Sequence, residues 1–126
     1  MLKYAKFIDV LHINIEKETN KNTYYRKVIA TTPNMQLVLM SLKPGQDIGL
    51  EVHPYITQFI RVEKGEGLAI IGDEEYTLVN GDAVIIPLNT KHNIINNTKK
   101  VLKIYTIYSG PNHPYDRINI TKPKKD

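Results

Sequence analysis

The sequence predicts one all-β domain, built as an antiparallel sandwich or barrel. Short apolar or alternating segments recur at regular spacing, and Gly, Pro and Asn separate them. No segment carries a convincing amphipathic helical pattern. With 126 residues, the chain has the length of a single domain with one hydrophobic core.

Most of the chain divides into segments with the composition of β-strands. Segment 11–15 alternates apolar and polar residues, and segment 34–42 is a continuous apolar run that ends at the turn KPGQ. The stretch GDEE favours a tight hairpin turn between two later strands. The secondary structure of segment 19–29 stays ambiguous. The other expected strands are 58–63, 68–71, 76–79, 83–88, 92–95 and 101–108.

The composition limits the class of protein. The chain is 41% apolar and 24% charged, which is ordinary for a globular domain. No apolar run approaches the roughly 20 residues that span a bilayer, and the N-terminus lacks the apolar region of a signal peptide. The chain has no cysteine, which excludes disulfides and thiolate ligands and fits a reducing compartment. We therefore expect a cytoplasmic protein without a membrane partner.

The net charge of +4 is concentrated at the two ends of the chain. Residues 1–27 carry six Lys or Arg against three acids, and residues 118–126 carry three Lys against one Asp. The middle, residues 28–117, has eight Lys or Arg against nine acids. No basic stripe with interleaved aromatic residues is present there, so we expect no nucleic-acid partner. The C-terminal TKPKKD is expected to be a solvated tail.

An unusual set of polar residues stands in the stretch GLEVHPYITQFIRVEKGEG. Glu51 and His53 are two residues apart, so on an extended segment they share one face. Gln58 follows at the start of an expected strand. Fixed spacings continue on either side of these residues. They run Gly45-x5-Glu51-x-His53-x4-Gln58-x6-Gly65 and then Gly81-x5-Pro87-x-Asn89-x2-His92-x3-Asn96.

The two blocks resemble the motifs of the cupin superfamily, G-x5-H-x-H-x3,4-E-x6-G and G-x5-P-x-G-x2-H-x3-N. The flanking segments are similar to those of small single-domain cupins of the mannose-6-phosphate-isomerase-like group. The resemblance implies a single jelly-roll barrel, also called a double-stranded β-helix. It also implies one cupin domain over residues 1–126. We expect its motif core at 45–96, an N-terminal strand extension at 1–33 and a C-terminal tail at 109–126.

The resemblance further implies that four side chains point inward at one metal ion: Glu51, His53, Gln58 and His92. Glu51 stands where the motif has His, and Gln58 where it has Glu. The set of two His, one carboxylate and one amide is similar to that of phosphomannose isomerases, with the amide and carboxylate exchanged. Such a set suits Fe, Mn, Ni or Zn as a divalent ion. The alternative is an empty barrel whose buried polar groups hydrogen-bond one another.

Asn89 replaces the second-motif Gly, and Asn tolerates the left-handed conformation of a turn.

His12 lies on the polar face of segment 11–15, so we expect it at the surface. Strand alternation places Arg61 opposite Gln58, hence outside the barrel or at an interface. Lys91 is a candidate clamp for a substrate phosphate.

Three residues near the end of the last strand are open candidates. His113 either folds over the barrel mouth or is an ordinary loop residue between two prolines. Tyr105 and Tyr108 lie on opposite faces of their strand, so one of them is a candidate proton donor and packing is the alternative for each.

Three functions remain open. The first is a metal-dependent enzyme that acts on a small polar metabolite, as a sugar or sugar-phosphate isomerase or as a dioxygenase. The second is a non-catalytic module that binds or senses a small ligand. The third is a metal-free epimerase with His53 as base, for which no Asp is placed to orient that imidazole. We also expect a homodimer, in which segment 11–15 adds a strand to a neighbour's sheet.

Overall fold

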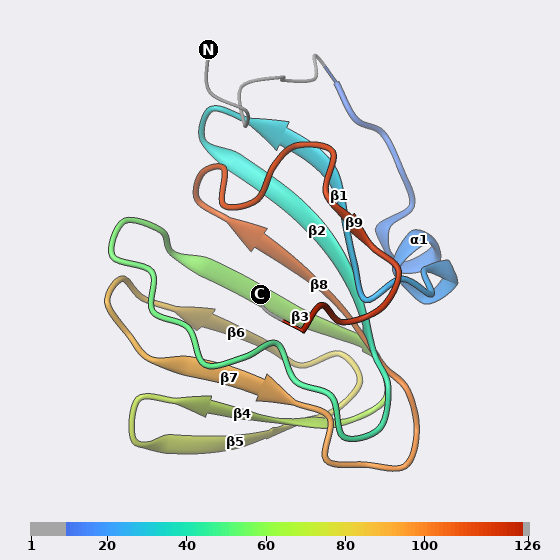
Figure 1. The fold of residues 1–126 in the computed structure, drawn as a ribbon, viewed down its shortest axis with the longest axis vertical. Coiled ribbons are helices and arrows are strands. Elements are labelled where there is room, and N and C mark those ends of the chain that lie inside the picture. Colours follow the sequence, from blue (N-terminus) through green and yellow to red (C-terminus); the bar gives the residue numbers. More distant parts are fainter. Residues whose placement is uncertain (1–9, 125–126) are drawn as a thin grey trace.

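The computed structural model describes residues 10–124 of the chain. Two β-sheets face one another and a short helix lies outside them (Figure 1). The predominantly β architecture expected from the sequence is confirmed. In chain order the elements are α1 (Ile15–Lys21), β1 (Arg26–Thr32), β2 (Met35–Leu42), β3 (Gln58–Lys64), β4 (Gly67–Ile71), β5 (Glu74–Leu78), β6 (Ala83–Ile86), β7 (His92–Ile95), β8 (Leu102–Tyr108) and β9 (Ile118–Asn119).

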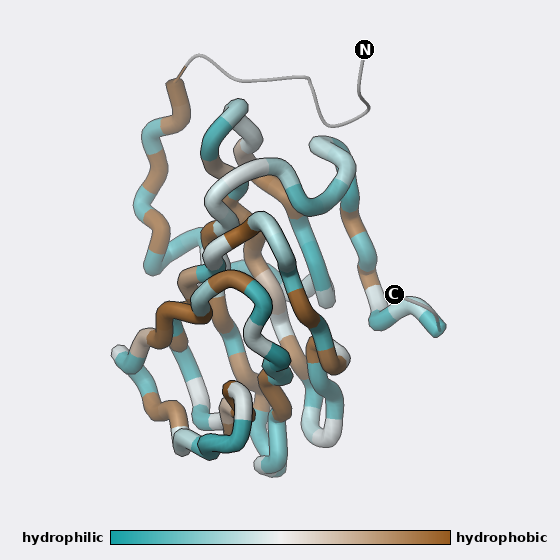
Figure 2. Tube along the Cα trace, turned by 90° about the vertical axis from the view of Figure 1, so that its left-hand side faces the viewer, coloured by the Kyte–Doolittle hydropathy of each residue, from teal (hydrophilic) through white to brown (hydrophobic). Residues whose placement is uncertain are grey.

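The larger sheet has six strands in the order β6-β3-β8-β2-β1-β9, and the smaller one has the order β5-β4-β7. All pairings are antiparallel. β8 lies between β2 and β3, although these three strands are far apart in the sequence. Hydrophilic and hydrophobic residues alternate along several strands, as expected when one face of each sheet covers a core (Figure 2).

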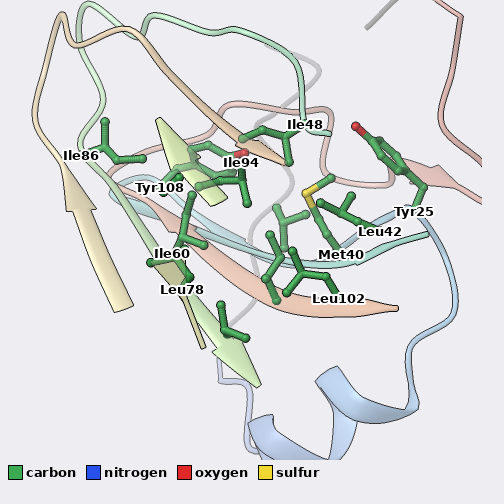
Figure 3. Packing of buried hydrophobic residues seen from close by; sticks show 14 of the residues in the cluster. Tyr25, Met40, Leu42, Ile48, Ile60, Leu78, Ile86, Ile94, Leu102 and Tyr108 are labelled. Atoms are coloured by element: carbon green, nitrogen blue, oxygen red, sulfur yellow. The ribbon is translucent and has the colours of Figure 1, made fainter. Parts of the chain in front are cut away.

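The core fills the space between the inner faces of the two sheets (Figure 3). Ile60 of β3 and Ile104 of β8 are fully buried, and they meet Ile94 from the smaller sheet in the same cluster. Tyr108 also belongs to this cluster, so the last residue of β8 points inward. The helix α1 lies on the opposite side of the larger sheet from these side chains (Figure 3).

The expectation of a strand at 11–15 is wrong. Residues 11–14 have no regular structure, and Ile15 begins α1. The reason is helix capping, because the side chain of Asn14 accepts a hydrogen bond of 2.9 Å from the Lys17 N–H. At the other end of the helix, Lys103 Nζ donates to the carbonyls of Asn20 and Asn22, at 2.8 and 2.7 Å. Segment 11–15 is therefore not a strand in this structure, and residues 1–9 lie outside the described part.

Within residues 10–124, no helix has the length and apolar composition needed to cross a bilayer.

The expectation of a solvated tail over TKPKKD, residues 121–126, is wrong for Lys122, which is half-buried in an ion pair. β9 pairs with β1, and Arg26 Nη1 donates to Asn119 Oδ1 at 2.9 Å. Lys122 then forms an ion pair with Asp47, which also accepts a hydrogen bond of 2.9 Å from Asn93 Nδ2. Residues 118–122 are therefore held against both sheets.

Two motif positions have a direct backbone explanation. A Cβ atom on Gly65 would lie 2.4 Å from the carbonyl oxygen of Val101, so only glycine fits there. Asn89 has a φ of 58°, which confirms the expectation that it takes the left-handed conformation of the usual motif glycine.

Candidate metal centre

The connection from β2 to β3, residues 43–57, brings the first motif beside the second. It runs along β7 and forms isolated bridges with it (Figure 1). The Glu51 N–H donates to the His92 carbonyl at 2.9 Å, and the His92 N–H returns a bond of 3.0 Å to the Glu51 carbonyl. The Asn89 N–H donates to the His53 carbonyl at 2.9 Å. These bonds place Glu51 and His92 directly opposite one another, with His53 two residues further along.

Three of the predicted ligands converge on one point inside the barrel. One ligand atom each from Glu51, His53 and His92 lies within 4.8 Å of the others. His53 Nε2 and Glu51 Oε2 are 3.9 Å apart, and the two imidazole centroids are 5.2 Å apart. The expected sharing of one face by Glu51 and His53 accounts for this arrangement, since residues i and i+2 of an extended segment point the same way.

The hydrogen bond of His92 fixes which ring nitrogen faces the cluster. Its Nδ1 lies 2.9 Å from the carbonyl oxygen of Thr90. Because a carbonyl oxygen only accepts, Nδ1 carries the proton and Nε2 keeps its lone pair. Nε2 of His92 and Nε2 of His53 are both buried and have no hydrogen-bond partner among residues 10–124.

Gln58 reaches the same interior from the larger sheet. It is the first residue of β3, its side chain is 1% exposed, and it pairs with Tyr108, whose ring packs edge-on to His53 at 5.9 Å. Its Nε2 donates to Thr106 Oγ1 at 2.9 Å, while its Oε1 is buried without a partner in the described chain. Unsatisfied buried polar atoms are costly, so these three unpaired ligand atoms fit a bound cation better than an apolar interior.

A second polar group borders the cluster on the side of the C-terminal segment. Tyr108 packs edge-on against His113 with centroids 5.6 Å apart, and the Tyr108 hydroxyl lies 3.4 Å from His113 Nε2. Asn112 Nδ2 lies 3.3 Å from the same nitrogen. His113 therefore folds back toward the ligand cluster, which is the first of the two placements open for it from the sequence.

A buried glutamine of β2 holds this segment in place. Gln36 is fully buried, and its Oε1 accepts from the backbone N–H groups of Asn112 and His113, both at 2.9 Å. Its Nε2 donates to the His113 carbonyl at 2.8 Å and to Thr31 Oγ1 at 3.0 Å. One side chain thus fixes both backbone polar groups of His113.

The comparison with protein families agrees with this geometry. The cupin domain family matches residues 38–108, which contain all four predicted ligands. The chain is a cupin. The expected small-cupin fold is thereby confirmed.

Relatives of this cupin extend the likeness over most of the chain. It is 47% identical over 116 residues to the uncharacterised protein L612 of Acanthamoeba polyphaga mimivirus, covering 89% of this chain and 72% of L612. It is 38% identical over 116 residues to YrkC of Bacillus subtilis strain 168, covering 87% of this chain but 62% of YrkC. The crystal structure of BH2720 from Bacillus halodurans has a TM-score of 0.86 at 38% identity, covering 88% of this chain and 89% of that one.

Burial sets the charge state of the groups around the cluster. It lowers the pKa of His53, and the nearby His92 lowers it further. Burial also lowers the pKa of His92, against the opposing effect of its bond to the Thr90 carbonyl. Both imidazoles are therefore neutral at neutral pH, which is the form that binds metal. Burial and the nearby Glu51 raise the pKa of Tyr108, so its hydroxyl keeps its proton.

The remaining predicted residues lie away from the cluster. His12 is exposed, as expected. Arg61 lies on the outer face of the larger sheet and pairs with Glu63, with Nε 2.7 Å from Oε1, which confirms the alternation argument. Tyr105 packs on that outer face against Phe59, at 6.1 Å between centroids. Lys91 is exposed, so the phosphate clamp stays a prediction without a supporting contact.

Sequence reasoning missed Gln36, Thr106 and Asn112. Two of them could have been found from the sequence, because Gln36 and Thr106 are each a polar residue on an otherwise apolar face of a buried strand. Asn112 carried no signal, because its position depends on how the C-terminal segment returns across the sheet.

Proposed function

We propose that this cupin is a metal-dependent enzyme that acts on a small polar metabolite. In this proposal Glu51, His53, Gln58 and His92 hold one divalent ion of Fe, Mn, Ni or Zn. The observation that carries the proposal is the set of buried, unpaired ligand atoms on His53, His92 and Gln58 beside a carboxylate. Two imidazoles and two oxygen ligands suit these ions and leave positions open for substrate.

The bound ion would act as a Lewis acid on a substrate oxygen. The chain's own groups would hold the substrate and manage its protons. Neutral imidazoles at positions 53 and 92 bind without proton competition near neutral pH. The protonated hydroxyl of Tyr108 belongs to a buried ring that packs edge-on against His53. A compact polar metabolite with adjacent oxygen atoms fits such a site.

Solved cupins of similar fold include an isomerase and an oxidase. One is a sugar phosphate isomerase from Silicibacter pomeroyi at 22% identity, with a TM-score of 0.57 over 60% of this chain and 50% of that one. Another is an oxalate oxidase at 21% identity, with a TM-score of 0.58 over 64% and 44%. These likenesses concern the fold, so the choice between isomerase and oxygen chemistry falls to experiment.

The first test is the metal content of the purified protein by elemental mass spectrometry. We expect near-stoichiometric metal in the wild type, loss in His53→Ala and His92→Ala, and retention in His12→Ala, whose imidazole is exposed. Absence of metal from the wild type, even after reconstitution, would refute the proposal.

The second test separates the reactions. Oxygen uptake by the iron-loaded protein with a panel of small hydroxy acids and sugars supports a dioxygenase. Isomerisation of sugar phosphates under strict anaerobiosis with Zn or Mn supports an isomerase. A metal-loaded protein that binds these compounds without turnover would instead be the non-catalytic ligand-binding module.

A further inference from the structure

The end of the barrel away from the predicted metal ligands carries an open cleft with a volume of about 650 Å³. Its lining comes from the turns that follow β3, β5 and β7, at residues 64–66, 79–80 and 98–101. The ends of β3 and β7 and the start of β8 lie together at this end of the barrel (Figure 1). Gln58 begins β3 and Lys64 ends it, so about 20 Å of strand separates the cleft from the ligand cluster.

We propose that this cleft, called here the lysine cleft, binds a small organic anion that carries two or more negative charges. Among residues 10–124, its lining contains three lysines and one acid: Lys64, Lys99, Lys100 and Glu66. Val79 and Val101 add apolar contacts. A compact carbon skeleton with phosphate or carboxylate groups fits this lining, and the volume is in the range of small-molecule sites. The proposal does not depend on the proposed metal site.

The positive charge is local to the lysine cleft. Residues 28–117 carry nine acids against eight Lys or Arg, so the composition of this region does not predict an excess of lysine at one end. Within residues 10–124, no ion pair engages Lys64, Lys99 or Lys100, and all three are exposed. Burial, and then the charge of Lys64, lower the pKa of Lys103. Lysines without a counter-ion around one concavity create a positive potential that attracts an anion.

A buried asparagine holds the turn that carries two of the lysines. Asn96 is fully buried, and its Nδ2 donates to the carbonyls of Leu42 and Lys100 at 2.9 and 2.8 Å. Its Oδ1 accepts from the N–H and the hydroxyl of Thr98, at 3.0 and 2.8 Å. One side chain thus fixes the backbone on both sides of Lys99.

The other two turns are also held by short-range contacts. Gly65 lies so close to the Val101 carbonyl that no side chain fits between them. Asp82 accepts a hydrogen bond of 2.9 Å from the Val79 N–H, so this neighbouring acid is directed at the backbone. The Gly81 N–H donates to a carbonyl of β3 at 2.8 Å. The motif positions at this end of the barrel therefore frame a preformed cleft, which reduces the entropy lost on binding.

The test is a titration of the ¹⁵N-labelled protein, followed by its amide NMR shifts at an ionic strength of about 20 mM. The probes are glycerol 3-phosphate and succinate as dianions and acetate as a monoanion. We expect at least one dianion to shift the amides of residues 64–66, 79–80 and 98–101 with a Kd of about 1 mM or tighter. Acetate should bind at least about tenfold more weakly, and an ionic strength of about 0.5 M should weaken dianion binding by at least about tenfold.

Charge-removing variants assign the binding to the lysine cleft. Lys99→Gln and Lys100→Gln should each weaken dianion binding by about two- to fivefold, and the triple variant with Lys64→Gln by more than about tenfold. Lys17→Gln is the matched control, because Lys17 is an exposed lysine of α1. It should bind the dianions as the wild type does.

The relative affinities name the class of ligand. Tighter binding of glycerol 3-phosphate assigns the cleft to organic phosphates, and tighter binding of succinate assigns it to dicarboxylates. A single-stranded oligonucleotide of about 12 nucleotides that bound more than tenfold more tightly than both dianions would show an extended polyanion surface and overturn the proposal.

Three other results would also overturn it: no saturable shifts at the cleft, shifts confined to residues 51–58 and 92, or equal losses in Lys17→Gln and the triple variant. Repeating the titration after treatment with a chelator keeps this test apart from the proposed function. Dianion binding at the cleft should be unchanged there, whether or not the protein binds a divalent ion.

Discussion

Replacing Gln36 by Leu should destabilise the protein strongly and release the segment that carries His113. The substitution keeps side-chain volume but removes every hydrogen bond of the amide. Two backbone N–H groups, at residues 112 and 113, and the carbonyl of His113 lose their partner. An unsatisfied buried polar group costs about 1–3 kcal/mol. Because the segment is half-buried, its backbone groups can form some hydrogen bonds with water, so we take the lower value for each group.

The expected loss is therefore about 3 kcal/mol in the free energy of unfolding, or roughly 10 °C in Tm for a domain of this size. Urea denaturation measures the loss in the free energy of unfolding. Hydrogen exchange of the amides at 112 and 113 measures the release of the segment that carries His113. Gln46→Leu is the control, because that side chain accepts a single bond of 2.8 Å from the Lys43 N–H in an exposed turn.

A loss below about 1 kcal/mol in Gln36→Leu, with the amides at 112 and 113 still protected, would refute the reasoning. It would mean that the segment is held by other contacts and that the buried amide is dispensable.

Three further predictions concern metal, the helix and pH. Removing the ion with a chelator should lower the free energy of unfolding by about 2.7 kcal/mol relative to protein at 100 times the Kd of the ion, seen as a drop in Tm by calorimetry. Lys103→Met should cost about 2–4 kcal/mol in urea denaturation, because two helix carbonyls lose a charged donor, whereas Lys99→Met at an exposed position should cost almost nothing. Burial alone would raise the pKa of Asp47, but Asn93 and Lys122 hold it below its ordinary 3.8. The ion pair therefore stabilises the protein fully above pH 3.8 and loses its effect as the pH falls through the lower folded-state value. Lys122→Met should thus be less stable than wild type at pH 7, by up to about 1 kcal/mol, and equally stable in acid.

The ligand cluster was predictable where it depends on local geometry. Glu51 and His53 share a face because they are two residues apart on an extended segment, and the motif spacing placed His92 opposite them. Gln58 followed from its place at the start of a strand. The membership of these residues in one metal site stays a proposal, as do the homodimer, the cytoplasmic location and the division of the chain into core, extension and tail.

The residues around the cluster were not predictable, since they depend on pairings between distant segments. Gln36 meets Tyr108 only through the register of β2 with β8, and His113 returns only because Gln36 receives it. The strand expected at 11–15 failed for a different reason. Five alternating residues are a weak signal, and the capping side chain of Asn14 outweighed it.

The central place of β8 has a consequence for how the protein is made. A nascent chain that stops before residue 102 already contains Glu51, His53, Gln58 and His92, but β2 and β3 have no strand between them. Their edges are open until residues 102–108 arrive, and such long-range pairing is slow and exposes strands to other chains. The proposed metal site would therefore be completed late in synthesis, and a ribosome-bound chain truncated before β8 should retain no divalent ion.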